Sequence, residues 1–359
     1  MKYLLRIICV MVMGFLMSTA TIAEDRTQKN KAWAESLLSE HCAAFPGVKC
    51  EQKNLNQINW SKKDLRQARL AHSTLREANL VGANLTGANL SYTDLTDANL
   101  RNANLTSANL EGAIITGVSF DGANLAYANL KVIQEPIGPV NCSIASSNQG
   151  NQSLPETSKS ITFIGSNLEG VFAVGIDLQG VDFSGANLYK AKFSNAKLNY
   201  SKFQDARIES TDFHGASLVC SSIVNVTATK ANFSQANLDS TKLTGGNFTG
   251  ANFEGATLTR SDARKSIFID SNFYGANFGG AILRESIFRG SKFDHAILEF
   301  GINFLGADLS FSDLRSASFI GVNFEGVRLE NTLLGDAIWV DRSQCAKNSV
   351  ETCQSVSGK

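Results

Sequence analysis

The chain has 359 residues, with 33 basic and 33 acidic side chains, so its formal net charge at neutral pH is zero. This balance argues against a protein that binds nucleic acid through a basic surface, and equally against a strongly acidic mimic of nucleic acid. Four prolines and 29 glycines are too few for a collagen-like or low-complexity disordered chain.

Residues 1–23 have the organisation of a secretory signal peptide. Lys2 and Arg6 give a positive start, and the apolar stretch 7–17 is too short to span a bilayer. Small residues then lead to Ala23, after which cleavage is expected. A permanent N-terminal anchor is the alternative, and the short apolar stretch argues against it. We therefore predict a periplasmic or extracellular protein without a later transmembrane segment.

The next segment, 24–52, precedes the regular part of the chain. Trp33, Leu37 and Leu38 have helical spacing in it, which predicts a short helix that caps the following structure. An amphipathic membrane-binding helix is the alternative. We favour the cap, because the segment is short and its charges are evenly distributed.

An internal repeat dominates the sequence. A large residue, usually leucine, falls at every fifth position from Leu55 to Leu130, and a small residue precedes it by two, as Ala83 precedes Leu85. A period of five suits neither a helix nor a plain strand. It fits a short extended segment with two inward residues followed by a corner, and four such segments close a square coil. A glycine such as Gly82 suits a corner with positive φ.

The pattern is interrupted once and slips once. Residues 133–160 contain three of the four prolines and a polar run, which indicates a loop. The repeat resumes at Phe163 with phenylalanine now as common as leucine. Leu298 and the next centre, Phe304, are six residues apart, and the last centre is Trp339.

The interruption leaves two arrangements open, a hinge between two rods or a loop on one continuous rod. We favour the continuous rod, because Leu130 ends a complete coil of four sides and Phe163 starts another. The predicted organisation is a signal peptide (1–23), an N-terminal cap (24–52), a first repeat block (53–132), a loop or linker (133–160), a second repeat block (161–341) and a C-terminal cap or tail (342–359).

These repeats resemble the pentapeptide-repeat family, whose consensus is A(D/N)LXX. Units such as 82–86 (GANLT) and 101–105 (RNANL) carry the resemblance, which covers roughly residues 53–341 apart from the interruption. It implies an all-β fold, a right-handed quadrilateral parallel β-helix or solenoid. Some members of the family, the quinolone-resistance proteins, mimic DNA and bind gyrase, so the resemblance also implies one alternative function.

The cysteines suggest disulfides. One of the seven lies in the signal peptide, and an even number of six then remains in an exported chain. The predicted pairs are Cys42–Cys50 and Cys345–Cys353, which would close the two caps, and Cys142–Cys220, which would tie the loop to the wall through an outward-pointing Cys220. Free thiols are the alternative. Metal binding is disfavoured, because no pair has the short spacing of a zinc site.

We find no pattern that indicates catalysis. The four histidines lie in no HExxH motif and beside no candidate nucleophile, and no phosphate-binding glycine loop occurs. Asparagines such as Asn84 and Asn104 recur every twenty residues, and calcium or sugar binding by such columns is one interpretation. We favour a structural role in turns. The prediction is a protein that is not an enzyme and has no cofactor or metal.

An apolar cluster is predicted at outward sites late in the second block. Ile267 and Ile287 are twenty residues apart, so they should stack on one side of the rod, and exposed apolar patches tend to mark contacts. Coverage by the loop or tail and a local distortion near the frame slip are the alternatives. The predicted patch comprises Ile267, Ile269, Ile287, Tyr274, Ile282 and Ile297.

The sequence thus predicts a non-enzymatic structural or protein-interaction scaffold, an exported rigid rod. Its predicted partner is a protein or cell-envelope macromolecule, or a second copy of the chain in a homodimer, and not a nucleic acid. A DNA-mimicking binder of an enzyme such as gyrase is the alternative. The signal peptide and the near-neutral charge disfavour that alternative.

Overall fold

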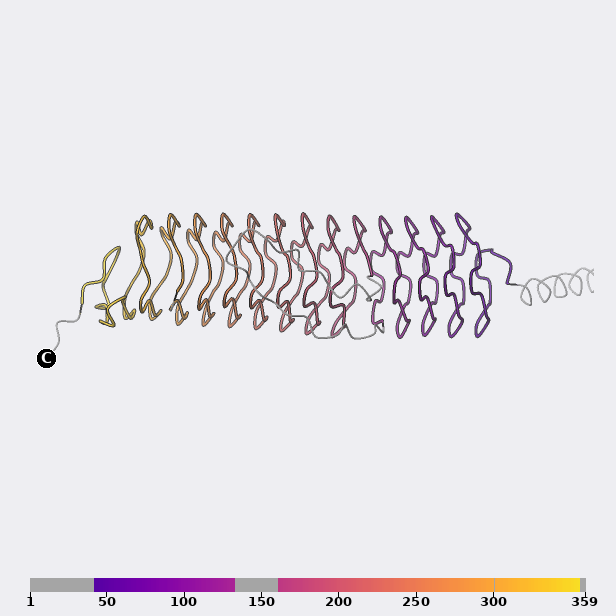
Figure 1. The fold of residues 1–359 in the computed structure, drawn as a ribbon, viewed down its shortest axis with the longest axis horizontal. Helices are drawn as coiled ribbons and strands as arrows, with labels where there is room; N and C mark the ends of the chain where they lie inside the picture. The colour runs from indigo at the N-terminus through magenta and orange to yellow at the C-terminus, as the bar shows by residue number, and fades with distance from the viewer. Residues whose placement is uncertain (1–41, 133–160, 300, 356–359) are drawn as a thin grey trace, which may run out of the picture.

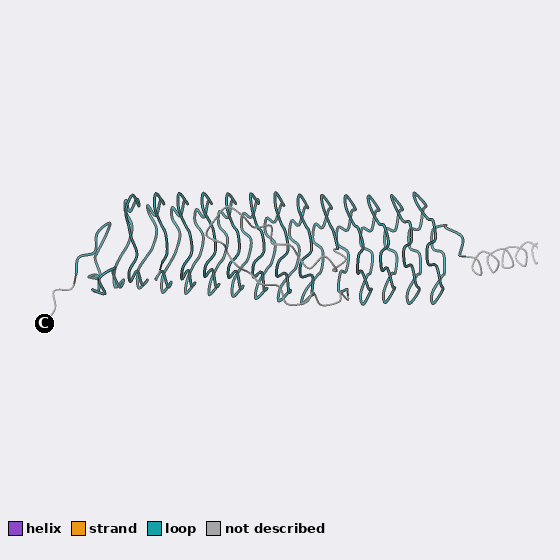
Figure 2. Cartoon of the chain, in the orientation of Figure 1, coloured by secondary structure: helices purple, strands orange, loops and turns teal. Residues whose placement is uncertain are grey.

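The computed structural model describes residues 42–132, 161–299 and 301–355, which form one elongated rod of stacked coils (Figure 1). These residues contain neither a helix nor a strand longer than one bridge residue (Figure 2). Within them, no helix is long and apolar enough to cross a bilayer. The predicted signal peptide and the predicted helix near Trp33 lie outside the described residues.

Each coil has four short sides. Parallel bridges join residues twenty apart, so Asn84 pairs with Asn104 and Asn104 with Asn124. Each unit of five consists of a two-residue turn and an extended segment whose middle residue forms the bridge. We number the sides 1 to 4 in chain order, starting from the central residues Leu55, Trp60, Leu65 and Leu70.

The unit 84–88 shows why this sequence pattern folds. Three of its five backbone N–H groups bond to neighbouring coils, one closes the turn, and one bonds to the asparagine side chain, so none is left unpaired. The asparagine therefore stabilises the corner, as the turn interpretation of the asparagine columns predicts. The bonds run from Leu85 to Asn104 O (2.7 Å), Gly87 to Thr106 O (2.9 Å), Asn84 to Lys63 O (2.8 Å), Ala88 to Leu85 O (2.9 Å) and Thr86 to Asn84 Oδ1 (3.2 Å).

Large side chains fill the interior in columns. The rings of Phe163, Phe183 and Phe203 stack on side 2 with centroids 5.2 and 5.0 Å apart. Their spacing matches that of neighbouring strands, about 4.8 Å. The second inward site holds a small residue, and where it is serine the hydroxyl bonds to the backbone, as Ser266 Oγ does to Leu243 O at 2.7 Å.

The rod is continuous across the interruption. Ser119 bridges to Thr162, and the ring of Phe120 stacks on that of Phe163 with centroids 4.8 Å apart. The prediction that Phe163 starts a new coil is wrong, however. Phe163 continues side 2 and does not begin a coil on side 1, because the core packs it on Phe120. Among the described residues, sides 2, 3 and 4 cross the interruption by bridges and side 1 does not.

The frame slip is absorbed at one corner. Ile282 bridges to Asn303, 21 residues later, and Ile287 bridges to Asp308 with the same offset. The extra residue lies between Leu298 and Gly301, since Gly301 lies directly above Gly280 in the corner column. The ladders therefore continue unbroken, with one residue more per coil at this point only.

Both ends of the described rod carry a disulfide. At the N-terminal end, Cys42 and Cys50 are bonded, with Cα atoms 5.6 Å apart. The first rung joins Lys49 to Arg69, so the coils begin ahead of residue 53.

The C-terminal tail covers the last coil. It returns antiparallel, with Leu333 bridged to Val350, and its own disulfide joins Cys345 to Cys353, with Cα atoms 5.0 Å apart. This pairing occupies backbone groups that an open end would leave exposed. We call these two bonds the cap disulfides.

Candidate binding faces

Three residues of each unit face outward, and they form columns along the rod. One is the bridge residue in the middle of a side. The other two form the corner, and the second of these has positive φ, whether it is glycine, such as Gly112 at 68°, or another residue, such as Lys190 at 58°. Because the columns repeat at every coil, a residue's position in the coil decides which face it joins.

The structure places Ile267 and Ile287 together on side 3. They are bridged to each other, and polar residues continue the column on either side, Asn247 before them and Asp308 after them. Ile269 follows at the corner between sides 3 and 4, and all three isoleucines are half-buried. We call Ile267, Ile269 and Ile287 the isoleucine stripe.

The other predicted members of the patch lie elsewhere. Ile282 occupies side 2, next to the stripe, whereas Ile297 lies on side 1, opposite it. Tyr274 lies at the corner between sides 4 and 1. The prediction of one six-residue patch is therefore wrong in part, because residues a few positions apart in sequence are separated by corners of the coil.

Sequence reasoning missed the charged residues around the stripe. Arg264 and Arg284 lie at the corner between sides 2 and 3, and Arg289 lies at the corner between sides 3 and 4. Arg264 pairs with Asp262 at 2.6 Å, and this hydrogen-bonded carboxylate raises the pKa of the guanidinium above its ordinary value. The sequence signal for this cluster was the spacing of Arg264 and Arg284, which are twenty residues apart.

A family model for pentapeptide repeats matches the chain in eight copies. They cover residues 64–102, 103–131, 162–199, 176–215, 186–223, 231–268, 271–302 and 300–331. The chain belongs to the pentapeptide-repeat family. Proteins of this family form right-handed quadrilateral β-helices, and the four-sided parallel coil described above is that fold.

Solved pentapeptide-repeat structures resemble the chain only distantly. HetL of the cyanobacterium Nostoc is 20% identical, with a TM-score of 0.24, over 84% of this chain and 90% of HetL. QnrB1, a plasmid-mediated fluoroquinolone resistance protein, is 25% identical, with a TM-score of 0.28, over 48% of this chain and 82% of its own. Structural similarities this weak assign no function to this chain. No curated protein matches it.

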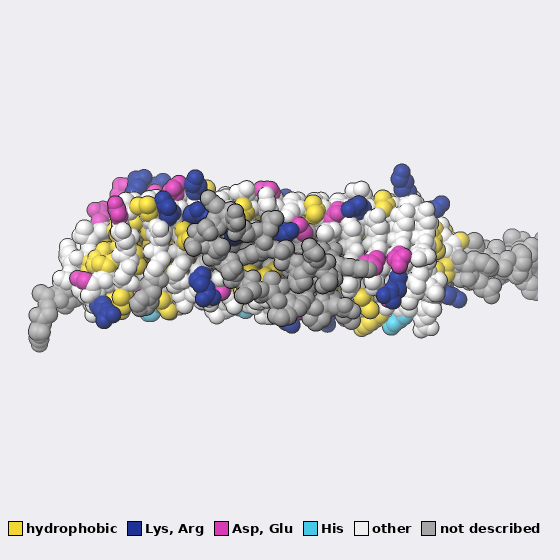
Figure 3. All heavy atoms as spheres, in the orientation of Figure 1, with side chains coloured by type: hydrophobic (Ala, Val, Ile, Leu, Met, Phe, Trp, Pro, Cys, Tyr) yellow, Lys and Arg dark blue, Asp and Glu magenta, His cyan; other side chains and the backbone are white. Residues whose placement is uncertain are grey.

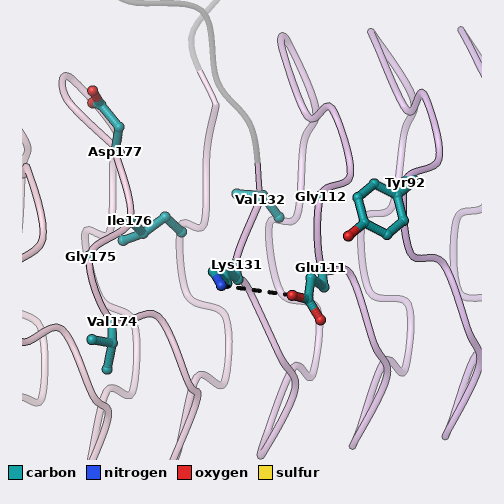
Figure 4. Close-up of a pocket in the computed structure, with 9 residues that line it drawn as sticks. All are labelled: Tyr92, Glu111, Gly112, Lys131, Val132, Val174, Gly175, Ile176 and Asp177. Atoms are coloured by element: carbon teal, nitrogen blue, oxygen red, sulfur yellow. Dashed lines mark ion pairs between the residues drawn. The ribbon is translucent and has the colours of Figure 1, made fainter.

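In this pentapeptide-repeat protein a shallow pocket of about 450 Å³ opens beside the interruption (Figure 4). Val132 and Ile176 give it apolar walls, and Glu111 and Lys131 form an ion pair at 3.8 Å on its rim. Tyr92 also lines it. Among the described residues, no three histidine, cysteine or acidic side chains converge as they would around a metal ion.

The cysteine of the wall departs from its predicted exposure. Cys220 lies at the corner between sides 1 and 2 with φ of 59°, as expected for an outward site, but only 5% of it is exposed. It is in a disulfide, which accounts for its burial. Cys142 lies outside the described residues, so the Cys142–Cys220 pairing stays a prediction.

Proposed function

We propose that this chain is a non-enzymatic protein-interaction scaffold that works in the periplasm or outside the cell. The observation that carries the proposal is the isoleucine stripe, in which two bridged residues, Ile267 and Ile287, occupy outward sites of the wall. Their neighbours in the same column are Asn247 and Asp308, so the change from polar to apolar is local. Local apolar patches on a polar surface are typical of contact sites.

The scaffold presents the stripe in a fixed geometry. Beneath it, the rings of Phe268 and Phe288 stack with centroids 4.9 Å apart and are fully buried. The backbone on either side is hydrogen-bonded from coil to coil, as Phe268 N–H is to Ile287 O at 2.6 Å. A surface that is already ordered loses little conformational entropy when it binds, so a small apolar patch can contribute usefully.

The side chains around the stripe indicate what kind of partner surface would fit it. Arginines border it at both corners, an arrangement found in interfaces that have an apolar centre and a charged rim. The guanidinium of Arg289 also lies 5.7 Å from the ring centroid of Phe311. We infer a partner protein with an apolar patch edged by acidic side chains.

The exported location rests on the cysteines and on the predicted signal peptide. Disulfides persist in oxidising compartments, and both ends of the rod are joined in this way. Gyrase binding through DNA mimicry would need an acidic surface in the cytoplasm. Near the C-terminal end of the face in Figure 3, basic and acidic side chains lie side by side. Cell fractionation tests the location, and a cytoplasmic protein would contradict the proposal.

The interaction is tested with the double variant Ile267→Ser/Ile287→Ser in the full chain. We expect it to lose the partner protein that the unmodified chain recovers from the exported fraction. Ile297→Ser is the matched control, because it makes the same change at a bridge position of the opposite side, where 43% of the residue is exposed. The proposal fails if the double variant stays folded and recovers the partner as well as the Ile297→Ser control does. It also fails if the folded double variant forms the same oligomer as that control.

A further inference from the structure

The exposed aromatic side chains of the described residues share one face of the rod. All of them lie on side 4 or at one of its two corners, and about half of each is exposed. The outward sites of sides 1, 2 and 3 carry mostly asparagine, serine, threonine, charged and aliphatic side chains, and Tyr200, at the corner between sides 1 and 2, is half-buried. The exposed rings are Tyr92, Tyr127, Phe172, Tyr274 and Phe311.

Two of these rings lie flat because the next coil provides a glycine. A methyl group placed on Gly112 would be 2.5 Å from the ring of Tyr92, and one placed on Gly170 would be 2.6 Å from the ring of Tyr127. Any larger residue at either glycine would push the ring away. The ring of His72 stacks on Tyr92 from the preceding coil, with centroids 5.0 Å apart, so both faces of Tyr92 are covered. Tyr127 rests one face on Gly170, and 62% of the residue is exposed.

Tyr127 and Phe172 are neighbours across the interruption. Phe172 bridges to Asn129 in the middle of side 4, two residues along the chain from Tyr127. Both side chains therefore border the same stretch of side 4, one rung apart, and we call this pair the platform. The hydroxyl of Tyr127 donates a hydrogen bond to Glu169 Oε1 at 3.0 Å, which fixes the direction of the ring.

Polar groups without a net charge surround the platform. Asn109 and Asn129 precede Phe172 in the side 4 column, with Asn129 Nδ2 donating to Asn109 Oδ1 at 3.1 Å. Lys192 and Asp212 follow it, one of each sign. A nucleic acid would require a basic excess along this face, because phosphate contacts dominate its affinity.

We propose that side 4 binds a linear, uncharged polysaccharide, with sugar rings stacked on Tyr127 and Phe172. A pyranose ring has an apolar face of C–H groups that matches a flat aromatic ring, and hydroxyl groups that match amides and carboxylates. The exposed rings are spread along side 4 over several coils, from Tyr92 to Phe311. A polymer can contact rings separated in this way, whereas the energetic centre of a protein interface is contiguous.

This site is separate from the isoleucine stripe on side 3, so the two proposals stand or fall independently. The probes are three soluble neutral polysaccharides, hydroxyethylcellulose, dextran and galactomannan, each cast into a native gel, with alginate as an anionic comparison. We expect at least one neutral polymer to retard the full-length exported protein. We expect Tyr127→Ala/Phe172→Ala to weaken that retardation on the order of tenfold or more.

Matched variants separate ring loss from misfolding. Ile164→Ala removes an apolar side chain that is 43% exposed at the corner between sides 2 and 3, and this variant should bind as the unmodified protein does. Tyr127→Phe keeps the ring and should retain binding, and Ile267→Ser/Ile287→Ser should also retain it. The proposal is overturned if no neutral polymer retards the protein, if the ring variant binds normally, or if only alginate binds and salt abolishes it.

Discussion

Replacing Leu100 with aspartate tests the coil architecture most directly. Leu100 is completely buried on side 2, where it is the central residue of its unit. Its backbone N–H bonds to Ser119 O of the next coil at 2.9 Å, so the residue belongs to the contact between two coils. Leu100→Asp replaces an apolar contact in that interface with a carboxyl group that has no partner.

The expected loss of stability is large. Removing the side chain of a buried leucine costs about 2–5 kcal/mol in the free energy of unfolding. Placing an unpaired carboxylate in the apolar interior adds several kcal/mol, unless the group takes up a proton and becomes neutral. Solenoid stability is the sum of repeat and neighbour terms, so a defect of this size should unfold the adjoining coils as well.

Arg101→Asp is the control, one residue further along the chain. Arg101 is exposed, and its Nε lies 3.5 Å from Asp121 Oδ2 in a surface ion pair. Losing such a pair costs at most about 1 kcal/mol. Thermal unfolding followed by circular dichroism should show an early transition in Leu100→Asp and a nearly unchanged curve in Arg101→Asp. Equal shifts in the two variants would refute the assignment of inward and outward sites.

Three further predictions concern the ends, acid stability and the corners. In the native protein both cap disulfides should resist alkylation, and a labelled cysteine in non-reducing peptide mapping would contradict its bond. The hydrogen bond from Arg315 holds the pKa of Asp313 below its ordinary value, so the pair stabilises the fold above the usual aspartate pKa and ceases to do so as the pH falls through the lowered one. Asp313→Asn should therefore make the free energy of unfolding depend less on pH in the acid range. At neutral pH the variant should lose less than about 1 kcal/mol of that free energy. An unchanged acid dependence would argue against this role of the pair. Gly165 has φ of 62° with open space around it, so Gly165→Ala should cost about 1 kcal/mol in chemical unfolding and Gly165→Asn less, whereas equal losses would exclude a backbone cause.

The repeat itself could be predicted from sequence because each unit is nearly independent of the rest. The large central residue, the small residue two before it and the corner residue all lie within five positions. Leu85, Ala83 and Gly82 thus specify their own unit without long-range information, and the structure buries the first two and gives the third positive φ. The cap disulfides were predictable for a similar reason, since their cysteines are eight residues apart.

Assignments that depend on position around the coil were harder to predict. Residues 133–160 do not follow the repeat, so counting in fives cannot fix the side on which the repeat resumes. The stacking of Phe163 on Phe120 decides it. The aromatic face was missed because its rings are scattered in sequence. Tyr92 and Gly112 are twenty residues apart, and that pairing was a readable signal.

The interruption also determines how far damage spreads along the rod. Among the described residues, the ladders of sides 2, 3 and 4 cross it. The chain leaves the repeat between Leu130 and Phe163, so no short covalent connection joins the coils on its two sides. In a chain of neighbour-coupled coils, unfolding that starts at one defect should stop at the weakest contact. We therefore expect hydrogen exchange in Leu100→Asp to accelerate throughout the coils before Leu130, while amides beyond Phe183 stay protected. Exchange that accelerates equally on both sides would show that the two blocks are coupled across the interruption as firmly as the coils within each block.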